Sequence, residues 1–333
     1  MSEKLNLPIR PRRNRKSPAI RGLVRETILH SSDLIYPLFI HESPENDVIA
    51  SMPGCYRWSI EGLLGEIGEA WRAGVRAVVF FPKIEEALKT SKAEESFNPR
   101  GLVPRAIKAV KAAYPDITII TDVALDPYNS DGHDGIVEMA ASGDLRILND
   151  ETVAVLCRQA LCHAEAGADI VSPSDMMDGR VGEIRAALDA AGFEDVAILS
   201  YTAKYASAYY GPFRGALDSA PKAGDKKTYQ MDPANRREAL REAELDIAEG
   251  ADMIMVKPAG PYLDIIRTLR DAFDIPIAAY QVSGEYLMIK SAAKDGWIDE
   301  EKVVMESLIG IKRAGADMIL TYFAKDVAAR LGA

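Results

Sequence analysis

Short apolar runs alternate with longer amphipathic segments along almost the whole chain. Several runs are apolar throughout, as expected for parallel strands that are covered on both faces. Eight such runs occur: Leu34–Ile40, Val75–Phe81, Ile117–Thr121, Asp169–Ser172, Val196–Ser200, Met253–Val256, Ile277–Tyr280 and Met318–Thr321. Segments of helical period lie at 59–73, 99–113, 149–166, 179–191, 233–249, 261–273, 285–295 and 300–314. This alternation predicts a (β/α)8 TIM barrel, with a doubly wound sheet as the alternative.

Glycine and capping residues mark the joints between these segments. The sequence Gly-Ala-Asp precedes three of the apolar runs, at Gly167–Asp169, Gly250–Asp252 and Gly315–Asp317. Glycine adopts the left-handed conformation that often ends a helix, so each of these sites predicts a helix-to-strand turn. Asn149 and Asp232 are candidate N-caps, and Pro233 suits the first helical position after Asp232.

Length and composition indicate one folded domain with an extension. The 333 residues are 48% apolar and 27% charged, which excludes a chain that is disordered throughout. A barrel uses roughly 200–300 residues, so we expect residues 1–33 to form an N-terminal oligomerisation arm and residues 34–333 the barrel. No run of about 18 apolar residues occurs, and we therefore expect no membrane span.

Charge is unevenly distributed along the chain. The formal net charge is −10, but residues 1–25 hold eight basic residues and one acidic residue, so they carry +7 against −17 elsewhere. A basic tail can bind nucleic acid, but this one has no aromatic residues to stack on bases. We favour an arm that packs on the acidic body of a neighbouring subunit, and we expect no nucleic-acid partner.

Cysteine usage indicates a reducing compartment. The three cysteines, Cys55, Cys157 and Cys162, are an odd number and lie apart, which does not suit a disulfide framework. The N-terminus lacks the apolar stretch of a signal peptide. Its basic residues leave a transit peptide as an alternative, but its prolines and scarcity of serine argue against one. We therefore expect a cytoplasmic protein.

Polar residues with acid, base and nucleophile chemistry follow the predicted strands, where a barrel carries its active site. They are Asp122, Ser172 and the segment after it, Lys204, Lys257, Ser283 and Tyr322. The long segment 201–231 follows one of these strands and has the length of a lid.

Lys257 is the most informative of these residues because it follows the apolar run Met253–Val256. Burial of an ammonium is costly, so its pKa should fall and leave a neutral, nucleophilic amine. Lys204 could supply a charge that lowers this pKa further, or be a second nucleophile. Such amines suit Schiff-base chemistry on a ketone or aldehyde. The alternative is a lysine that pairs with a carboxylate or phosphate.

The aspartate-rich segment 122–134 admits three interpretations. Its carboxylates could bind a hard divalent cation, take part in acid–base catalysis, or cap backbone amides in a turn. His30, His41 and His163 have no defensible partner pattern. The chain has no glycine-rich phosphate loop of the GxGxxG or GxxxxGK[ST] type, which argues against nucleotide binding.

Four motifs resemble the 5-aminolevulinate dehydratase family, also called porphobilinogen synthase, and the similarity runs from Arg10 to Ala324. They are SPSDMMDGR (172–180), SYTAKYASAYYGPFR (200–214), GADMIMVKPAGPYLD (250–264) and YQVSGEY (280–286). The resemblance implies a (β/α)8 barrel, a homo-octamer or hexamer with a gripping arm, and condensation of two 5-aminolevulinate molecules to porphobilinogen with loss of water. This reaction belongs to tetrapyrrole synthesis.

The resemblance also assigns roles to individual residues. It implies Schiff bases on Lys257 and Lys204, at the propionate and acetate sides of the product respectively, with Asp122 steering proton transfers. One substrate carboxylate would be held by Arg214, Lys226 and Gln230. The other would be held by Ser283 and Tyr322.

The metal sites implied by the resemblance depart from one branch of the family. Zinc-using members carry three cysteines where this sequence has Ala124, Asp126 and Asp134, so we expect no catalytic Zn²⁺. The sequence is similar to the aspartate-rich, non-zinc branch, in which Asp126 and Asp134 could hold a cation. Glu242 matches the position of a regulatory Mg²⁺, with an exposed helical glutamate as the alternative. No organic cofactor is implied.

Two other functions compete with this one. An aldolase acting on another carbonyl donor would also use a barrel lysine, but two lysines with two carboxylate-binding sets favour two keto-acid substrates. A non-enzymatic assembly protein is disfavoured because Lys204, Lys257 and Arg214 are all present.

Overall fold

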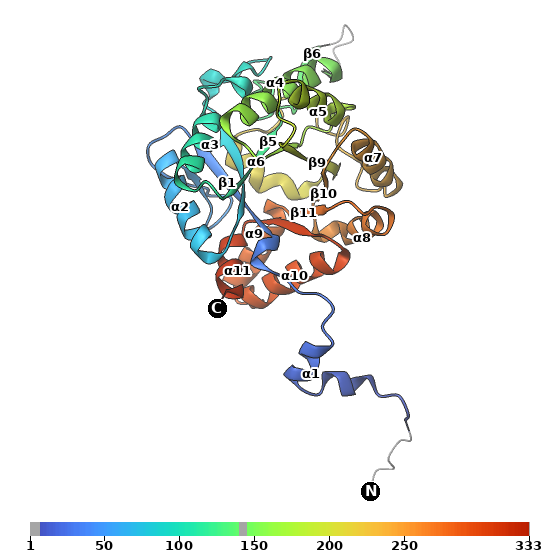
Figure 1. The fold of residues 1–333 in the computed structure, drawn as a ribbon. Helices are drawn as coiled ribbons and strands as arrows, with labels where there is room; N and C mark the ends of the chain where they lie inside the picture. The colour runs from blue at the N-terminus through green and yellow to red at the C-terminus, as the bar shows by residue number, and fades with distance from the viewer. Residues whose placement is uncertain (1–6, 140–144, 333) are drawn as a thin grey trace.

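The computed structural model describes residues 7–139 and 145–332, and it contains a closed barrel of parallel strands (Figure 1). The barrel strands are β1 (Leu34–His41), β4 (Ala77–Lys83), β5 (Thr118–Val123), β8 (Ile170–Pro173), β9 (Ala197–Lys204), β10 (Met253–Lys257), β11 (Ile277–Gln281) and β12 (Met318–Thr321). The last strand pairs with the first through Leu34↔Ile319 and Ile35↔Leu320. This closure confirms the predicted TIM barrel and excludes the doubly wound sheet.

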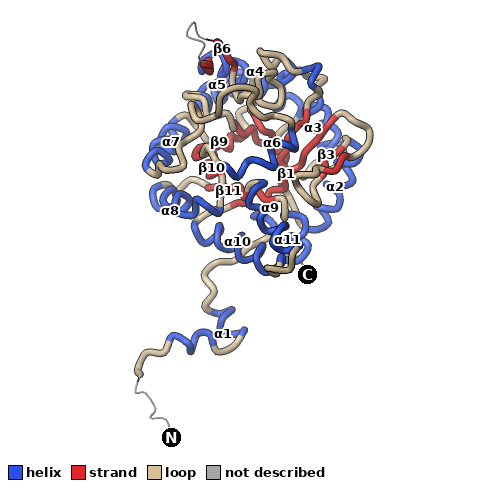
Figure 2. Tube along the Cα trace, turned by 180° about the vertical axis from the view of Figure 1, so that it is seen from behind, coloured by secondary structure: helices blue, strands red, loops and turns tan. Residues whose placement is uncertain are grey.

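Helices surround the strands on the outside of the barrel, as both views show (Figures 1 and 2). They are α2 (Ile60–Ala73), α3 (Leu102–Ala113), α4 (Asn149–Ala166), α5 (Arg180–Ala190), α7 (Arg237–Ala248), α8 (Leu263–Ala272), α9 (Ser283–Lys294), α10 (Glu300–Ala314) and α11 (Ala324–Leu331). The strands are buried on both faces by these helices and by the barrel interior. Their continuous apolar runs follow from that double coverage.

Both predicted N-caps are wrong. Helix α7 begins at Arg237, and the Asp232 carboxylate instead accepts from Ala234 N at 2.8 Å, which makes a local turn before the helix. Asn149 is the first residue of α4 rather than its cap. Its side-chain oxygen accepts from Asp178 N at 2.8 Å, so it ties the start of α4 to the loop after β8.

The three Gly-Ala-Asp repeats close the amino-terminal end of the barrel. Each glycine ends its helix with a positive φ, which lies between 102° and 127°. Each aspartate then accepts from the backbone N–H of the strand before it. The contacts are Asp169 with Ile119 N (2.7 Å), Asp252 with Ile198 N (2.7 Å) and Asp317 with Ile277 N (2.8 Å). The turns are as predicted, and the aspartates add side-chain contacts between neighbouring strands that periodicity alone does not reveal.

Several elements lie outside the predicted pattern. Strands β2 (Asp47–Val48) and β3 (Tyr56–Trp58) extend the sheet beside β1, and β6 (Ile136–Met139) pairs with β7 (Leu145–Leu148) in a separate hairpin. Helix α6 (Gly211–Leu217) lies in the long connection between β9 and α7. Within the described residues, no helix has the length and apolar character needed to span a membrane.

The N-terminal segment extends away from the barrel (Figure 1). It contains a 3-10 turn (Pro11–Arg15) and α1 (Pro18–Leu23), and neither has a buried residue. Ile9 and Leu23 are 80% and 86% exposed. Glu3 and Lys4 of the expected basic arm lie outside the described residues.

Candidate active site

Two lysines meet at the carboxyl ends of adjacent barrel strands. Lys204 is the last residue of β9 and Lys257 the last of β10, and the two are register partners in the sheet. Both side chains are buried, with exposed fractions of 5% and 6%. The end of the barrel that normally carries catalysis therefore presents two amines side by side.

Lys257 lies in a ring of aromatic side chains. Its Nζ is 4.6 Å from the ring centre of Tyr280 and 5.0–5.2 Å from those of Tyr201, Phe213 and Tyr210. Burial and, after it, the charge of Lys204 lower the pKa of Lys257 from 10.5 to about 7. Near neutral pH, a large fraction of this amine is therefore unprotonated and nucleophilic.

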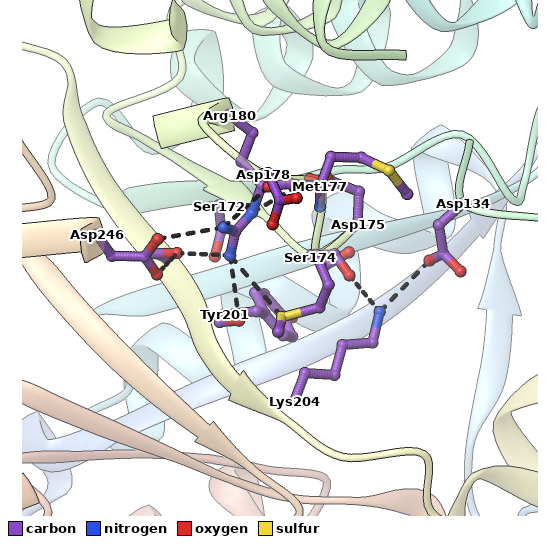
Figure 3. A network of polar contacts seen from close by, with 12 residues as sticks. Asp134, Ser172, Ser174, Asp175, Met177, Asp178, Arg180, Tyr201, Lys204 and Asp246 are labelled. Carbon is purple, nitrogen blue, oxygen red and sulfur yellow. Dashed lines mark hydrogen bonds and ion pairs between the residues drawn. The ribbon is translucent and has the colours of Figure 1, made fainter. Parts of the chain in front are cut away.

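Lys204 is held by polar groups instead. Its Nζ donates to the Ser174 carbonyl oxygen and lies 3.4 Å from Asp134 Oδ1 (Figure 3). The carbonyl and the carboxylate fix the position of this amine. The site therefore combines one amine in an aromatic pocket with a second that is held by polar groups.

Aspartates from the loop after β5 surround the two amines. Asp122, at the end of β5, is buried and has a pKa raised to about 7, first by burial and then by the charge of Asp126. Asp134 differs: burial alone would raise its pKa, but the charges of Lys204 and Lys226 outweigh burial and hold this pKa well below its usual value. Asp122 can thus exchange a proton near neutral pH, whereas Asp134 stays charged.

Lys226 lies between the other two carboxylates, with Nζ 2.7 Å from Asp134 Oδ2 and 3.3 Å from Asp126 Oδ2. The charges of these two aspartates raise the pKa of Lys226 against the opposing effect of burial. Tyr229 also donates to Asp134 Oδ2, at 2.9 Å. Asp126 and Asp134 are therefore neutralised by an ammonium of this chain.

Residues 205–231, which we call the covering segment, close the site at the carboxyl end of the barrel. This segment supplies Lys226, Arg214 and Gln230 to a cavity whose other walls include both lysines and Asp122. The cavity volume is about 30 Å³, which holds only a few water molecules. The structure brings Arg214, Lys226 and Gln230 together in one cavity, and this cavity has no room for two substrates.

Ser283 and Tyr322 do not line that cavity. Ser283 Oγ accepts from Phe213 N at 3.0 Å, and the Tyr322 hydroxyl is 2.8 Å from that of Tyr280. The Phe213 ring packs 5.6 Å from Phe39, which stacks on Tyr322 at 5.8 Å. Tyr322 is one contact away from Lys257, because Tyr280, whose ring lies beside the Lys257 amine, also bonds to the Tyr322 hydroxyl. Ser283 is bonded to the backbone of the covering segment.

Glu242 lies apart from the lysines, on α7 at the outside of the barrel. It is half-buried, and it lines a hollow of about 550 Å³ together with Asp178 and Glu238. Burial raises the pKa of Glu242, and the nearby carboxylates raise it further, whereas the charge of Arg180 opposes this shift. No group of three or more histidine, cysteine or acidic side chains arranged to hold a metal occurs within residues 7–139 and 145–332.

Sequence reasoning did not single out three residues that shape the site. Ser174 supplies the carbonyl that holds Lys204, Tyr229 braces Asp134, and Glu285 joins two loops. Glu285 Oε1 accepts from Gly260 N at 2.7 Å, and its Oε2 accepts from Val282 N at 2.8 Å and from Ala259 N at 3.4 Å. The capping-box position of Glu285, three residues after Val282, was the one available signal.

Comparison with known proteins places this arrangement in a family. A family model described as delta-aminolevulinic acid dehydratase matches residues 8–330. The chain belongs to the delta-aminolevulinic acid dehydratase family. It is 62% identical over 322 residues to the chloroplastic delta-aminolevulinic acid dehydratase of Physcomitrium patens, covering 96% of this chain and 73% of that one. It is also 62% identical over 326 residues to delta-aminolevulinic acid dehydratase 1, chloroplastic, of Arabidopsis thaliana, covering 97% and 75%.

A solved structure extends this match to the fold of the dehydratase. The delta-aminolevulinic acid dehydratase of Toxoplasma gondii ME49, in complex with the reaction product porphobilinogen, is 56% identical and superposes with a TM-score of 0.95. The match covers 98% of this chain and 92% of that one. The predictions of the family, of a hydro-lyase and of a role in tetrapyrrole synthesis are therefore confirmed.

The relatives also correct the expected location. Relatives from moss and several flowering plants are named chloroplastic, which contradicts the expected cytoplasmic location. The cysteine argument failed because it identifies a reducing environment, and more than one compartment is reducing.

Proposed function

We propose that this dehydratase condenses two molecules of 5-aminolevulinate to porphobilinogen through Schiff bases on Lys257 and Lys204. The observation that carries the proposal is the pair of buried lysines at the ends of β9 and β10, one of them with a pKa lowered to about 7. Each amine can accept one ketone, so two keto-acid substrates can be bound at once. The balanced reaction releases two water molecules for each porphobilinogen formed.

The lysines differ in the chemistry they offer. The neutral amine of Lys257 attacks a substrate ketone, and the resulting carbinolamine loses water to give an iminium. Asp122, with a pKa of about 7, is the group best suited to move protons during these steps. At Lys204, the neighbouring Asp134 carboxylate can stabilise the iminium that forms there.

Carboxylate binding requires the covering segment to rearrange. Arg214, Lys226 and Gln230 would hold one substrate carboxylate, which would replace the aspartates as the partner of Lys226. Ser283 and Tyr322 would hold the other once Ser283 Oγ is released from its hydrogen bond with Phe213 N. Closure over both substrates would exclude water from a dehydration.

The residues present favour the aspartate-rich, non-zinc branch of the family. Ala124 offers no ligand, and the Lys226 ammonium already lies between Asp126 and Asp134, so this set does not fit Zn²⁺ or another cation. Glu242 fits Mg²⁺ better, because this ion keeps several waters and needs only one or two carboxylates. Bound there, Mg²⁺ would neutralise the carboxylates around Glu242. No organic cofactor is required.

We propose that residues 1–33 act as an oligomerisation arm on a catalytic barrel formed by residues 34–333. The arm exposes Ile9 and Leu23, and no residue of 7–26 is buried in the single chain, which supports a partner surface on a second subunit. Its positive charge complements an acidic body. A homo-octamer is the expected assembly, with a hexamer as the alternative, and neither nucleic acid nor membrane is an expected partner.

Borohydride reduction in the presence of 5-aminolevulinate tests the mechanism. Reduction converts an imine into a stable amine, so peptide mass spectrometry should locate substrate adducts on Lys257 and Lys204. Lys257→Ala should abolish turnover, while the control Lys294→Ala, at an exposed lysine of α9, should retain it. Absence of any adduct on Lys257 in the active enzyme would defeat the proposal, and an adduct formed only with another carbonyl compound would favour an aldolase.

A further inference from the structure

A buried charge network lies behind Lys204, between α5, α7 and β9 (Figure 3). The Arg180 side chain, at the start of α5, is 2% exposed. Its Nη1 donates to Asp246 Oδ1 of α7 at 3.1 Å, and its Nη2 donates to Ser200 Oγ of β9 at 3.1 Å. Ser200 Oγ in turn donates to Asp246 Oδ2 at 2.7 Å. One guanidinium therefore joins a helix of the outer layer to the strand that carries Lys204.

The same guanidinium also holds the turn after β8. Its Nη1 donates to the Met177 carbonyl oxygen at 3.3 Å, and its Nε lies 3.7 Å from Asp175 Oδ2. Asp175 Oδ1 accepts from Met177 N at 2.7 Å. Met176, between them, has a φ of 71°, a left-handed conformation that is unfavourable for a residue with a side chain. Such a conformation persists only where the surroundings fix it.

This turn carries the carbonyl that holds the second amine. Ser174 precedes Asp175, and its carbonyl oxygen accepts from Lys204 Nζ. A lysine side chain has four rotatable bonds and loses considerable conformational freedom when it is fixed at one point. The position of the Ser174 carbonyl therefore determines where the Lys204 amine lies relative to Lys257.

We propose that Arg180 is a positioning residue for the reaction: by fixing the turn 173–178 against β9 and α7, it places the Ser174 carbonyl that aims Lys204 at its substrate. The inference rests on the proposed Schiff base at Lys204. Arg180 touches neither amine, and it acts through Asp175, Met177 and the turn between them. This role is specific to arginine, because its planar guanidinium donates several hydrogen bonds in fixed directions, whereas a lysine ammonium supplies a charge at one point only.

Site-resolved borohydride trapping with 5-aminolevulinate tests this role. The variants are Arg180→Lys, which keeps the charge but loses the planar guanidinium, and Asp175→Asn, which keeps the shape but weakens the pair. The matched control is Asp252→Ala, which removes a contact to Ile198 N at the opposite end of β9. Each protein is compared with the unmodified enzyme by its far-ultraviolet circular dichroism and by its oligomer size, and adducts on the two lysines are quantified separately.

We expect the ratio of Lys204 adduct to Lys257 adduct to fall by roughly ten- to a hundredfold in both variants, since misplacing a reacting group by about 1 Å costs on the order of a hundredfold. The control should keep the ratio of the unmodified enzyme. An unchanged ratio in folded Arg180→Lys and Asp175→Asn, or a parallel loss of both adducts, would overturn the role of Arg180 alone. An unmodified enzyme without a Lys204 adduct would remove the proposed role of Lys204, and this inference with it.

Discussion

Replacing Lys257 by methionine should inactivate the enzyme and yet stabilise it. Methionine has a similar length, no charge and a good fit to an aromatic pocket such as that formed by Tyr201, Phe213 and Tyr280. The buried amine, by contrast, opposes folding, because the unfolded chain holds its proton more tightly than the folded one does. A residue kept for its reactivity at the expense of stability is a common feature of active sites.

The magnitude follows from the two pKa values of Lys257, 10.5 for the ordinary amine and about 7 in the folded protein. Below pH 7 the amine is protonated in both states, and the full cost applies, about 5 kcal/mol. Between pH 7 and pH 10.5 the unfolded state binds more protons, so stability rises with pH as this cost declines. It is about 4 kcal/mol at pH 7 and about 2 kcal/mol at pH 9.

Urea unfolding at pH 7 and pH 9, at one protein concentration because subunit association shifts stability, measures this difference. Lys257→Met should raise the free energy of unfolding by a few kcal/mol at pH 7 and by about half as much at pH 9. Lys204→Met is the control with the opposite sign, since it leaves Asp134 and the Ser174 carbonyl short of a donor and should cost about 1–3 kcal/mol. An equal or lower stability of Lys257→Met at pH 7, or a gain that does not shrink by pH 9, would refute the reasoning.

Three further perturbations probe other parts of the site. Lys226→Gln removes the ammonium between the two aspartates and a donor for substrate carboxylate, so the KM for 5-aminolevulinate should rise by roughly tenfold or more in steady-state assays; an unchanged KM would remove Lys226 from binding. Glu285→Ala leaves backbone N–H groups after β10 and β11 without an acceptor and should cost about 2–4 kcal/mol in urea unfolding, with a smaller loss in Glu285→Gln. If Glu242 holds Mg²⁺, a chelator should lower activity and added Mg²⁺ restore it, while Glu242→Gln should respond to neither; full activity in chelator would contradict the site.

Much of the barrel could be predicted from local pattern. Each continuous apolar run became a strand because parallel strands are covered on both faces, and each Gly-Ala-Asp became a turn because glycine tolerates the positive φ. Lys257 could be singled out because a charge directly after the apolar run Met253–Val256 indicates a buried amine, although the local sequence alone left an ion pair as the alternative.

The rest of the site depends on contacts between distant parts of the chain. Lys226 and Asp126 are separated by 100 residues, and nothing local to either predicts their ion pair. Ser174 acts through its backbone carbonyl, which is the same for every residue type and leaves no mark on the sequence. The hydrogen bond between Phe213 N and Ser283 Oγ depends on how the covering segment folds over the barrel, and the turns of this segment have no periodicity that would predict it.

The aspartate contacts at the amino-terminal end of the barrel have a consequence for how this enzyme can change. Asp169, Asp252 and Asp317 fasten neighbouring strands at the end opposite the lysines. Substitutions around Lys204 and Lys257 can therefore alter substrate or rate without loosening these contacts. The amino-terminal end of the barrel thus maintains the fold, while residues at the carboxyl end can be substituted to change the chemistry.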